Sequence, residues 1–437
     1  MIRENTSVIN RFSPNRSDIV GASRYFNNEN ISSESMVKCL TDHCSRQVKG
    51  KHVLAISDTT EFSFQHHLNF LNLRDGELGP ITHDSDYGYF LHTMLALDAN
   101  TSMGLGYSYV KLWNRAPNKK NKYERKYKEQ PIEEKESYRW IESALQTKDL
   151  LSSADSLTIV ADRESDIYEE FVQLKDKQCD LLIRSGQNRP LYNDPKKLNE
   201  YLSSLPVQGS YKIAIRKTQS RSKRTANIDI RFSRVRIKRP AIHSHNAPEY
   251  IELNAVEACE KTTANDGIHW RLLTTHKVET IADAMQVIQW YGKRWEIELL
   301  FGLLKSAGLN TEESELESGK ALKRLTIMNL EVALKILQLK QARDGAVMES
   351  ARVAYSTQQL AILKVLTKEY EGKTQKQKNP WPKEYLSWVS WIIARMGGWK
   401  GYQSEAKPGT KTMKWGLDKL HAYEYAYSTL LKTKLCA

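Results

Sequence analysis

The sequence lacks the features that mark exported and membrane-spanning proteins. Its first residues, MIRENTSVINRF, contain no apolar leader segment. Nowhere do about 18 uncharged apolar residues follow one another, which is the length that a transmembrane helix needs. We therefore expect a cytoplasmic protein that has no membrane partner.

Cysteine is scarce and scattered. Five cysteines occur in 437 residues, and no two of them form a C-x-x-C pair. An odd number without paired spacing argues against a disulfide framework and against a structural zinc site. The phosphate-binding signature G-x-x-x-x-G-K-[ST] is also missing, so we do not expect a nucleoside triphosphate to supply energy for the chemistry.

Basic residues and core-forming residues are plentiful. The chain carries 65 Lys and Arg against 52 Asp and Glu, a formal net charge of +13. Such a charge favours a polyanionic partner, for example nucleic acid. A hydrophobic content of 40% with 9% aromatics is ample for folded cores in a chain of this length.

The central part of the chain predicts a mixed α/β sheet. Residues 1–52 have a pattern typical of helices. From Val53 the pattern becomes that of apolar strands, namely HVLAIS, YFLHTMLALDA and GLGYSYVKLW. An amphipathic helix over about 133–150 precedes the strand SLTIVA, and a helix over about 165–174 precedes the strand DLLIRS. Three antiparallel-type strands followed by strand, helix and strand are the pattern of an α/β fold.

The rest of the chain predicts a β-rich segment and then helices. In a segment of about 186–278, the strands YKIAIRK, NIDIRFSRVRIKR and HWRLLTT place Arg and Lys at alternate positions, and hence on one face. Residues 280–339 are expected to be helical. A C-terminal helical region over 346–437 is rich in tryptophan, namely Trp388, Trp391 and Trp415.

Two acids stand where apolar strands end. Asp58 follows LAIS, and Asp162 follows TIVA. Acids at the carboxyl ends of neighbouring strands point into the crevice where ligands bind in α/β sheets. Taken singly, each can equally be a turn former or a helix N-cap.

A third acid lies in the apolar run WYGKRWEIELLFGLLKSAGL. At about 100° per residue, Arg294, Glu298 and Lys305 fall within roughly a 40° arc, and Tyr291 joins them if the helix continues through Gly292. Buried charges need partners, so this strip must meet another side chain, a metal ion or phosphates. The alternative is a solvated i,i+4 pair of Arg294 and Glu298. On one continuous helix, Tyr291 and Lys305 would be about 21 Å apart along the axis. That span suits a track of phosphates better than one small ligand.

Three converging carboxylates repel one another and require counter-charge. Oxygen-only ligands select Mg²⁺ or Mn²⁺, and two such ions roughly 3.5–4 Å apart can support phosphoryl transfer. From the residues alone, a nuclease and a polynucleotidyl transferase both remain open.

The motifs resemble those of a known family. The Y-x2-R-x3-E-x6-K spacing of Tyr291, Arg294, Glu298 and Lys305 is similar to the YREK signature of IS-four-type insertion-sequence transposases, and in particular to the Tn-five transposase branch. AISDTT and VADRESDIY resemble its first two acidic motifs in the same order. Further similarity lies in GASRYFNNENIS, EKESYRW, LLIRS, HWRLLTT and IARMGGW, so the resemblance covers most of the chain.

This resemblance implies a role for each motif residue. Asp58, Asp162 and Glu298 would be the catalytic acids that bind Mg²⁺, for which Mn²⁺ can substitute. Tyr291, Arg294, Lys305 and Arg184 would contact DNA phosphates, and Trp270 would stack against a flipped base. For Trp270 the alternative is a core aromatic. The basic segments NKKNKYERKYK and TQSRSKRTA are either further phosphate contacts or solvated charge runs.

The resemblance also implies an architecture. An RNase H-like catalytic core over 53–345 would be interrupted by the β-rich insertion, with an N-terminal DNA-binding region over 1–52 and a C-terminal dimerisation domain over 346–437. The expected activity is cut-and-paste transposition by a homodimer acting at the nucleoid on double-stranded DNA, both transposon ends and target. The alternative is an N-terminally shortened form, deficient in end binding, that pairs with and inhibits the full-length enzyme.

Overall fold

The computed structural model describes residues 16–82, 86–116, 130–215, 223–241, 247–262, 267–306, 308–346, 348–402 and 404–435. The basic segment NKKNKYERKYK lies outside these ranges, and so do the first five residues of TQSRSKRTA. No helix within the described ranges combines the length and the apolar character that crossing a bilayer would take.

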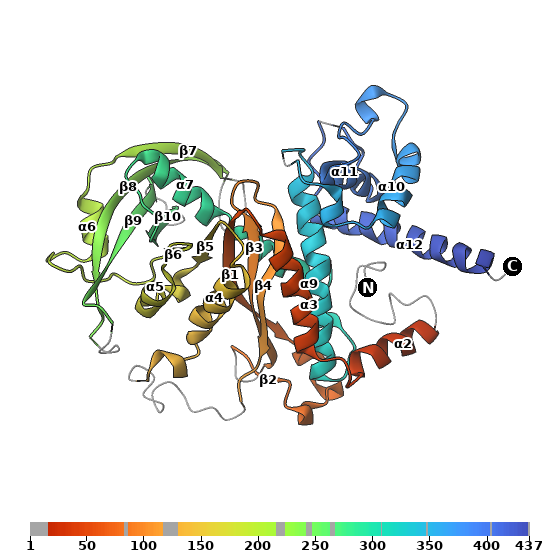
Figure 1. Cartoon of the computed structure of the whole chain (residues 1–437), viewed down its shortest axis with the longest axis horizontal. Helices are drawn as coiled ribbons and strands as arrows, with labels where there is room; N and C mark the ends of the chain where they lie inside the picture. Colours follow the sequence, from red (N-terminus) through yellow and green to blue (C-terminus); the bar gives the residue numbers. More distant parts are fainter. Residues whose placement is uncertain are drawn as a thin grey trace.

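One mixed sheet of ten strands organises the chain (Figure 1). Its order is β2-β3-β1-β5-β6-β10-β9-β8-β7, and β4 pairs with β3. β1, β5 and β6 are parallel to one another, whereas the other pairings are antiparallel. The predicted mixed α/β fold is thereby confirmed. The strands are β1 (His52–Ser63), β2 (Gly79–Pro80), β3 (Tyr87–Asp98), β4 (Gly104–Trp113), β5 (Ser156–Ala161), β6 (Cys179–Arg184), β7 (Gly209–Ile215), β8 (Arg224–Lys238), β9 (Tyr250–Glu260) and β10 (His269–Thr274).

Helices cover both faces of the sheet. α4 (Tyr138–Leu150) and α5 (Tyr168–Leu174) pack on one face, while α7 (Ile281–Gly292), α8 (Trp295–Lys305) and α9 (Gly319–Ala342) belong to the core on the other. Alternation along β1 sorts its side chains between the two cores. Val53 and Ala55 join the core beneath α4 and α5, whereas Leu54 and Ile56 join the core beneath α8 and α9.

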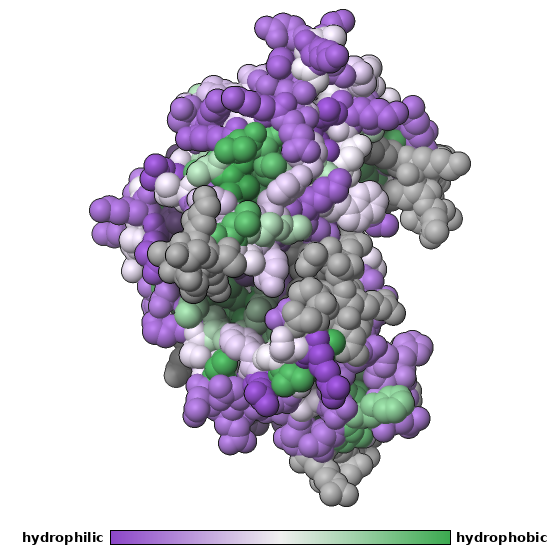
Figure 2. Space-filling model, turned by 90° about the vertical axis from the view of Figure 1, so that its right-hand side faces the viewer, coloured by the Kyte–Doolittle hydropathy of each residue, from purple (hydrophilic) through white to green (hydrophobic). Residues whose placement is uncertain are grey.

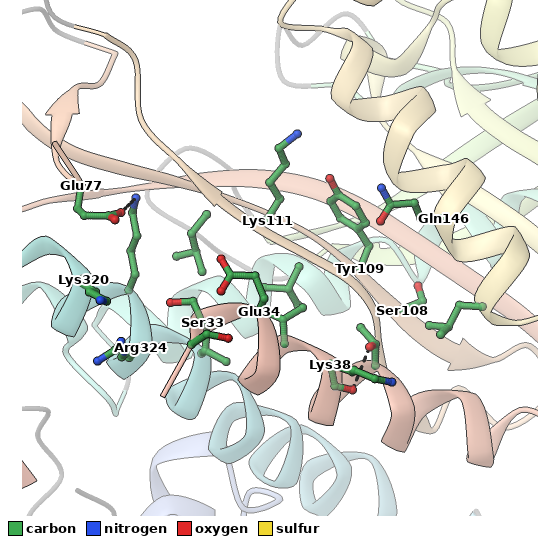
Figure 3. A pocket seen from close by; sticks show the side chains of 18 of the residues that line it. Ser33, Glu34, Lys38, Glu77, Ser108, Tyr109, Lys111, Gln146, Lys320 and Arg324 are labelled. Atoms are coloured by element: carbon green, nitrogen blue, oxygen red, sulfur yellow. Dashed lines mark hydrogen bonds and ion pairs between the residues drawn. The ribbon is translucent and has the colours of Figure 1, made fainter. Parts of the chain in front are cut away.

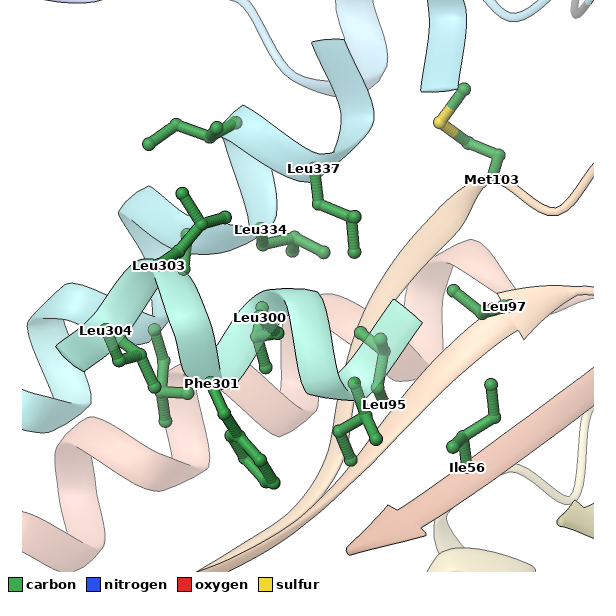
Figure 4. Packing of buried hydrophobic residues seen from close by; sticks show 14 of the residues in the cluster. Ile56, Leu95, Leu97, Met103, Leu300, Phe301, Leu303, Leu304, Leu334 and Leu337 are labelled. Atoms are coloured by element: carbon green, nitrogen blue, oxygen red, sulfur yellow. The ribbon is translucent and has the colours of Figure 1, made fainter. Parts of the chain in front are cut away.

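The second of these cores fixes the position of α8. Leu300, Leu303 and Leu304 of α8 lie between the α9 residues Leu334 and Leu337 and the strands β1 and β3 (Figure 4). All of these leucines are almost wholly buried. Burying side chains of this size contributes about 1.5–3 kcal/mol each, so α8 is held firmly against the sheet.

The structure corrects the predicted helix around residue 290. The sequence pattern allowed one helix through Gly292, but α7 ends there and α8 begins at Trp295. At the junction, the amides of Lys293 and Arg294 bond to carbonyls three residues back, on Trp290 and Tyr291. This tightened turn interrupts the α-helical hydrogen bonds, so the four residues do not lie on one continuous helix.

The β-rich segment contains a strand that the sequence pattern did not reveal. β9 was missed because its glutamates break the hydrophobic alternation. Those glutamates pair with arginines of neighbouring strands: Glu252 with Arg234 and Arg236 of β8, and Glu257 with Arg231. The basic face predicted for this segment is therefore partly neutralised by β9.

The remaining helices flank the sheet. α2 (Arg16–Asn27) and α3 (Ser33–Gln47) contact α9, and α3 also packs on β4. α10 (Thr357–Tyr370), α11 (Leu386–Met396) and α12 (Thr410–Leu435) gather at one end of α9 (Figure 1). The face that carries them is largely hydrophilic, with hydrophobic patches near its middle (Figure 2). A short helix, α6 (Leu198–Ser204), contacts β8.

Candidate active site

β1 sends two neighbouring side chains to opposite faces of the sheet. Asp58 lies two residues after Ile56, so both side chains are on the face of the sheet that α8 covers, whereas Thr59 is on the face that α4 covers. The strand is antiparallel to β3 and parallel to β5, and it is buried up to Ser57. Asp58 is thus the first carboxylate beyond the buried part of a central strand.

Arg294 joins two of the three predicted acids. Its Nη1 lies 2.7 Å from Oδ2 of Asp58, and its Nη2 lies 2.9 Å from Oε1 of Glu298. The side chains of Arg294 and Asp58 are only 15% and 18% exposed, so this contact is not a surface ion pair. The alternative of a purely solvated i,i+4 pair is therefore wrong, because the guanidinium also reaches across to β1.

Asp162 stands where β5 ends. Its Oδ1 accepts the amide of Glu164 at 2.9 Å, so it caps the short 3-10 helix Arg163–Ser165. The alternative that Asp162 is a helix N-cap, which the sequence allowed, is thus confirmed. Its charge also acts on Asp58: burial raises the pKa of Asp58 to about 6, with Asp162 and Glu298 adding to the rise while the amide of Thr59 and Arg294 oppose it.

In this structure, the carboxylates of Asp58, Asp162 and Glu298 are too far apart to bind one metal ion together. Among the residues that the structure describes, no three His, Cys, Asp or Glu side chains are grouped closely enough to hold a metal ion. What lies between Asp58 and Glu298 is the Arg294 cation. A hollow of about 670 Å³ opens on Asp58, and another of about 760 Å³ opens on Glu298.

Three further predicted residues lie beside the acids. Tyr291 is buried at the end of α7, and Trp270 of β10 meets it edge to face, with ring centroids 5.1 Å apart. Burial raises the pKa of the Tyr291 hydroxyl, while the nearby charges of Arg294 and Arg184 oppose that rise. Arg184 ends β6 and donates from Nη2 to the carbonyl of His269. The tertiary structure therefore gathers Arg184, Trp270 and Tyr291 around Arg294.

Lys305 lies further along α8. Its Nζ is 5.7 Å from the centre of the Phe62 ring, near the end of β1. Within the described part of the chain it has no acidic partner at ion-pair distance. Its charge is thus open to a ligand, although it does not share the contacts of Arg294.

Arg139 links the segments of two acids, and the sequence analysis gave it no role. It belongs to the EKESYRW motif and lies in the first turn of α4. Its Nε lies 3.1 Å from Oγ1 of Thr59, and its Nη2 lies 2.7 Å from Oε2 of Glu164. Thr59 and Glu164 in turn donate their amides to Asp58 and Asp162. Arg139 thus spans the backbone segments that orient both aspartates.

A buried histidine completes this support. His92 of β3 contacts Oγ1 of Thr59 through Nδ1 at 2.8 Å and Oγ of Ser143 through Nε2 at 3.0 Å. Burial lowers the pKa of His92 to about 3, and the charges of Arg139 and Lys111 lower it further. The imidazole ring is therefore neutral, and its hydrogen bond holds the Thr59 side chain in place on the α4 side of the sheet.

Asp166 ties the loop after Arg184 to the loop after Asp162. Its carboxylate accepts the amides of Gly186 and Gln187 and pairs with Arg189 at 2.7 Å. The Asp166 and Arg189 side chains are 1% and 5% exposed. A hollow of about 260 Å³ beside them is lined by Arg163, Arg184, Ser185, Gly186, Gln187, Asn188, Asn199, His269 and Arg271.

A separate hollow of about 680 Å³ lies between α3, β4, α4 and α9 (Figure 3). It contains none of the predicted site residues. Three of its lysines are paired with carboxylates within the fold: Lys38 with Asp42, Lys111 with Glu142 and Lys323 with Glu77. The candidate active site is therefore the acidic site where β1 runs past the end of β5.

The fold and this site define a mixed α/β protein in which Arg294 joins an acid of the central strand β1 to an acid of α8, with a third acid after β5. Residues 89–330 match the protein family described as Transposase DDE domain, which is more than half of the chain. The chain belongs to this family, so the prediction of a DDE transposase is confirmed at that level. The match includes Asp162 and Glu298, whereas Asp58 lies before it.

One solved structure shows a distant likeness. It is described as the cryo-EM structure of piggyBac transposase synaptic complex with hairpin DNA. The sequences are 12% identical, and the TM-score is 0.39 over 78% of this chain. The present chain spans 57% of the length of that chain. At this score the likeness carries no argument about fold or function.

Proposed function

We propose that this protein is a DNA transposase of the IS-four type, in the Tn-five-like branch, with Tyr291, Arg294, Glu298 and Lys305 as its YREK residues. Membership of the transposase DDE domain family supports the general activity. The observation that carries the proposal is the bridge of Arg294 between Asp58 and Glu298, beside the charge of Asp162.

The proposed core is RNase H-like. The order β4-β3-β1-β5-β6, with β5 and β6 parallel to β1, supports this. Asp58 lies within β1, two residues beyond its last pair with β5, and Asp162 directly follows β5. The segment of about 186–278, with α6 and β7 to β10, would be an insertion into that core over 53–345. Residues 1–52 and 346–437 would be the DNA-binding and dimerisation regions.

Asp58, Asp162 and Glu298 would hold Mg²⁺, or Mn²⁺ in its place. Their oxygen-only donor set fits such ions, and the Arg294 cation stands where the carboxylates need positive charge. When bound, two such ions would activate an attacking oxygen and stabilise the leaving one in phosphoryl transfer. Arg294 must release at least one acid before all three can converge.

The proposed reaction sequence proceeds on phosphodiester bonds. Water attacks at the transposon end and releases a 3′-OH, and this hydroxyl attacks the opposite strand to form a hairpin. A second water opens the hairpin, and the regenerated 3′-OH then joins to target DNA. Each step breaks one phosphorus–oxygen bond and forms one, so no nucleotide cofactor is needed.

The other predicted residues would hold the DNA. Arg184, Arg294 and Lys305 supply positive charge and Tyr291 a hydroxyl, all suited to phosphates. Trp270 would stack against a flipped base. Its present ring partner is Tyr291, in an edge-to-face contact. The proposed partners are double-stranded transposon ends, target DNA and a second copy of the chain, all in the cytoplasm at the nucleoid.

The test is nicking of DNA that carries the inverted repeats flanking the gene. Wild-type protein with Mg²⁺ should nick this DNA, whereas Asp58→Asn, Asp162→Asn and Glu298→Gln should bind it without cutting. Asp155→Asn, at an exposed acid before β5, is the matched control and should cut normally. Mg²⁺-dependent nicking by any of the three site variants would refute the assignment of that acid.

A further inference from the structure

One face of α8 carries a glycine between an acid and a lysine. At about 100° per residue, Glu298, Gly302 and Lys305 fall within roughly 60° of one another around the helix axis. Glu298 and Lys305 are about 10.5 Å apart along that axis, with Gly302 between them. The amide of Ser306 donates to the Gly302 carbonyl at 3.0 Å, so the helix is continuous at this position. Gly302 therefore leaves a gap between two charged side chains of the same face.

Packing within the fold does not require this glycine. Apart from its chain neighbours and the backbone of its own helix, a Cβ placed on Gly302 would meet no atom of the described residues within 4 Å. By contrast, a Cβ on Gly319 of α9 would lie 2.7 Å from the Cβ of Glu77. One on Gly416 of α12 would collide with the carbonyl oxygen of Ile393. Those two glycines permit close packing, whereas the position of Gly302 has room for a side chain.

A glycine in the interior of a helix weakens that helix. Glycine loses more conformational freedom on folding than any other residue, and only proline is a poorer helix former. Alanine would fit at position 302 without touching the rest of the fold. What glycine provides there instead is open space directly above the backbone of α8.

The groups on either side of the gap indicate what fills this space. At one end, Glu298 is paired with the Arg294 cation at 2.9 Å. At the other end, the Nζ of Lys305 lies 5.7 Å from the centre of the Phe62 ring. Two cations with an uncharged gap between them match a phosphodiester strand, in which charged phosphates alternate with uncharged sugars.

We propose that Gly302 is a contact point for the sugar–phosphate backbone of the DNA strand that is cut, and that the missing side chain lets this strand lie directly against α8. This inference rests on the proposed function, since it takes DNA as the substrate. It assigns a role to a residue outside the acids and the YREK residues. A side chain at position 302 would project into the path of the strand and hold the phosphodiester away from Glu298.

The test measures stability and DNA binding, because the proposal predicts opposite changes in the two. Gly302→Ala should raise the urea midpoint of unfolding, since alanine fits and favours the helix. The same variant should weaken the binding of inverted-repeat DNA, measured by fluorescence anisotropy without divalent ions so that no cleavage occurs. Gly302→Leu has a longer side chain, so it should weaken binding further. It should also lower the Mg²⁺-dependent nicking rate by about 100-fold, the cost of a misplacement of about 1 Å.

Two matched variants serve as controls. Gly21→Ala replaces a glycine of α2 that is equally free of neighbours, and its urea midpoint gives the reference for the expected gain in stability. Ala282→Leu places a leucine at an exposed position in the first turn of α7, at the opposite end of that helix from Tyr291. This second control should change neither the DNA affinity nor the nicking rate.

Three outcomes would overturn the inference. A lower urea midpoint for Gly302→Ala would show that the fold itself needs the glycine. Wild-type affinity and nicking in Gly302→Leu would show that no strand lies against this position, and the proposed function would stand because the protein still cuts. If the wild-type protein neither binds nor nicks the DNA, the proposed function fails and this inference fails with it.

Discussion

The Arg294 guanidinium lies between Asp58 and Glu298, 2.7 Å from the first carboxylate and 2.9 Å from the second. The three groups come from β1, the α7–α8 junction and α8. Two carboxylates near a third, Asp162, would repel one another without this cation. Arg294 therefore stabilises the acidic site of the protein alone, and under the proposed function it would compete with a metal ion for the same oxygens.

Replacing Arg294 should alter metal and DNA binding in opposite directions. We expect Arg294→Ala to bind Mn²⁺ more tightly in the absence of DNA, because the competing cation is gone. Its DNA affinity should fall, and the salt slope should flatten by about 0.9, the value of one phosphate contact. Titration calorimetry with Mn²⁺ and anisotropy at several salt concentrations measure the two effects. Weaker Mn²⁺ binding would contradict the competition.

Arg139 should act by positioning the acids. We expect Arg139→Lys to lower the nicking rate by about 100-fold, since a lysine cannot reach Thr59 and Glu164 together and a small misplacement of catalytic groups is costly. DNA affinity should stay the same. Lys148→Ala, on the same helix and paired with Asp176, is the matched control and should nick at the normal rate. An equal loss in DNA affinity would show a binding role instead.

The buried pair of Asp166 and Arg189 should matter for stability. Asp166→Ala leaves a buried guanidinium and two loop amides without their acceptor, so we expect unfolding to become easier by about 3–5 kcal/mol. Asp42→Ala removes the exposed partner of Lys38 and should cost no more than about 0.5 kcal/mol. Urea denaturation compares the two variants. Similar midpoints would show that the buried pair contributes little.

His92 should make stability depend on pH. Its pKa is about 3 in the folded protein and about 6.5 when unfolded, so between these values the unfolded chain binds the extra proton. Stability should therefore fall as pH drops from about 6.5 toward 3, by up to about 1.4 kcal/mol per pH unit. His92→Gln should flatten this dependence, measured by urea denaturation across the window. His66→Gln, at an exposed histidine, should leave the slope unchanged.

The sequence by itself determined the elements and the identity of the acids. Alternating and continuous apolar runs predicted β1, β3, β4, β5 and β6. A strand buried on one face has alternating apolar residues, and a strand buried on both faces is apolar throughout. The predicted position at the end of a strand is correct for Asp162, which directly follows β5, and wrong for Asp58, because β1 continues beside β3 to Ser63. The order of the motifs predicted a DDE transposase, and the match to the transposase DDE domain family confirms that part of the prediction.

Only the tertiary structure decided which groups meet. The turn at Lys293 and Arg294 depends on hydrogen bonds and packing that helical periodicity does not encode. β9 was missed because its glutamates break the apolar pattern, and the arginines that pair with them lie on the neighbouring strand β8. The contacts of Arg294 with Asp58 and of Arg139 with Thr59 join residues 236 and 80 positions apart. Contacts at such separations follow from how the helices dock on the sheet, and local sequence pattern carries no record of them.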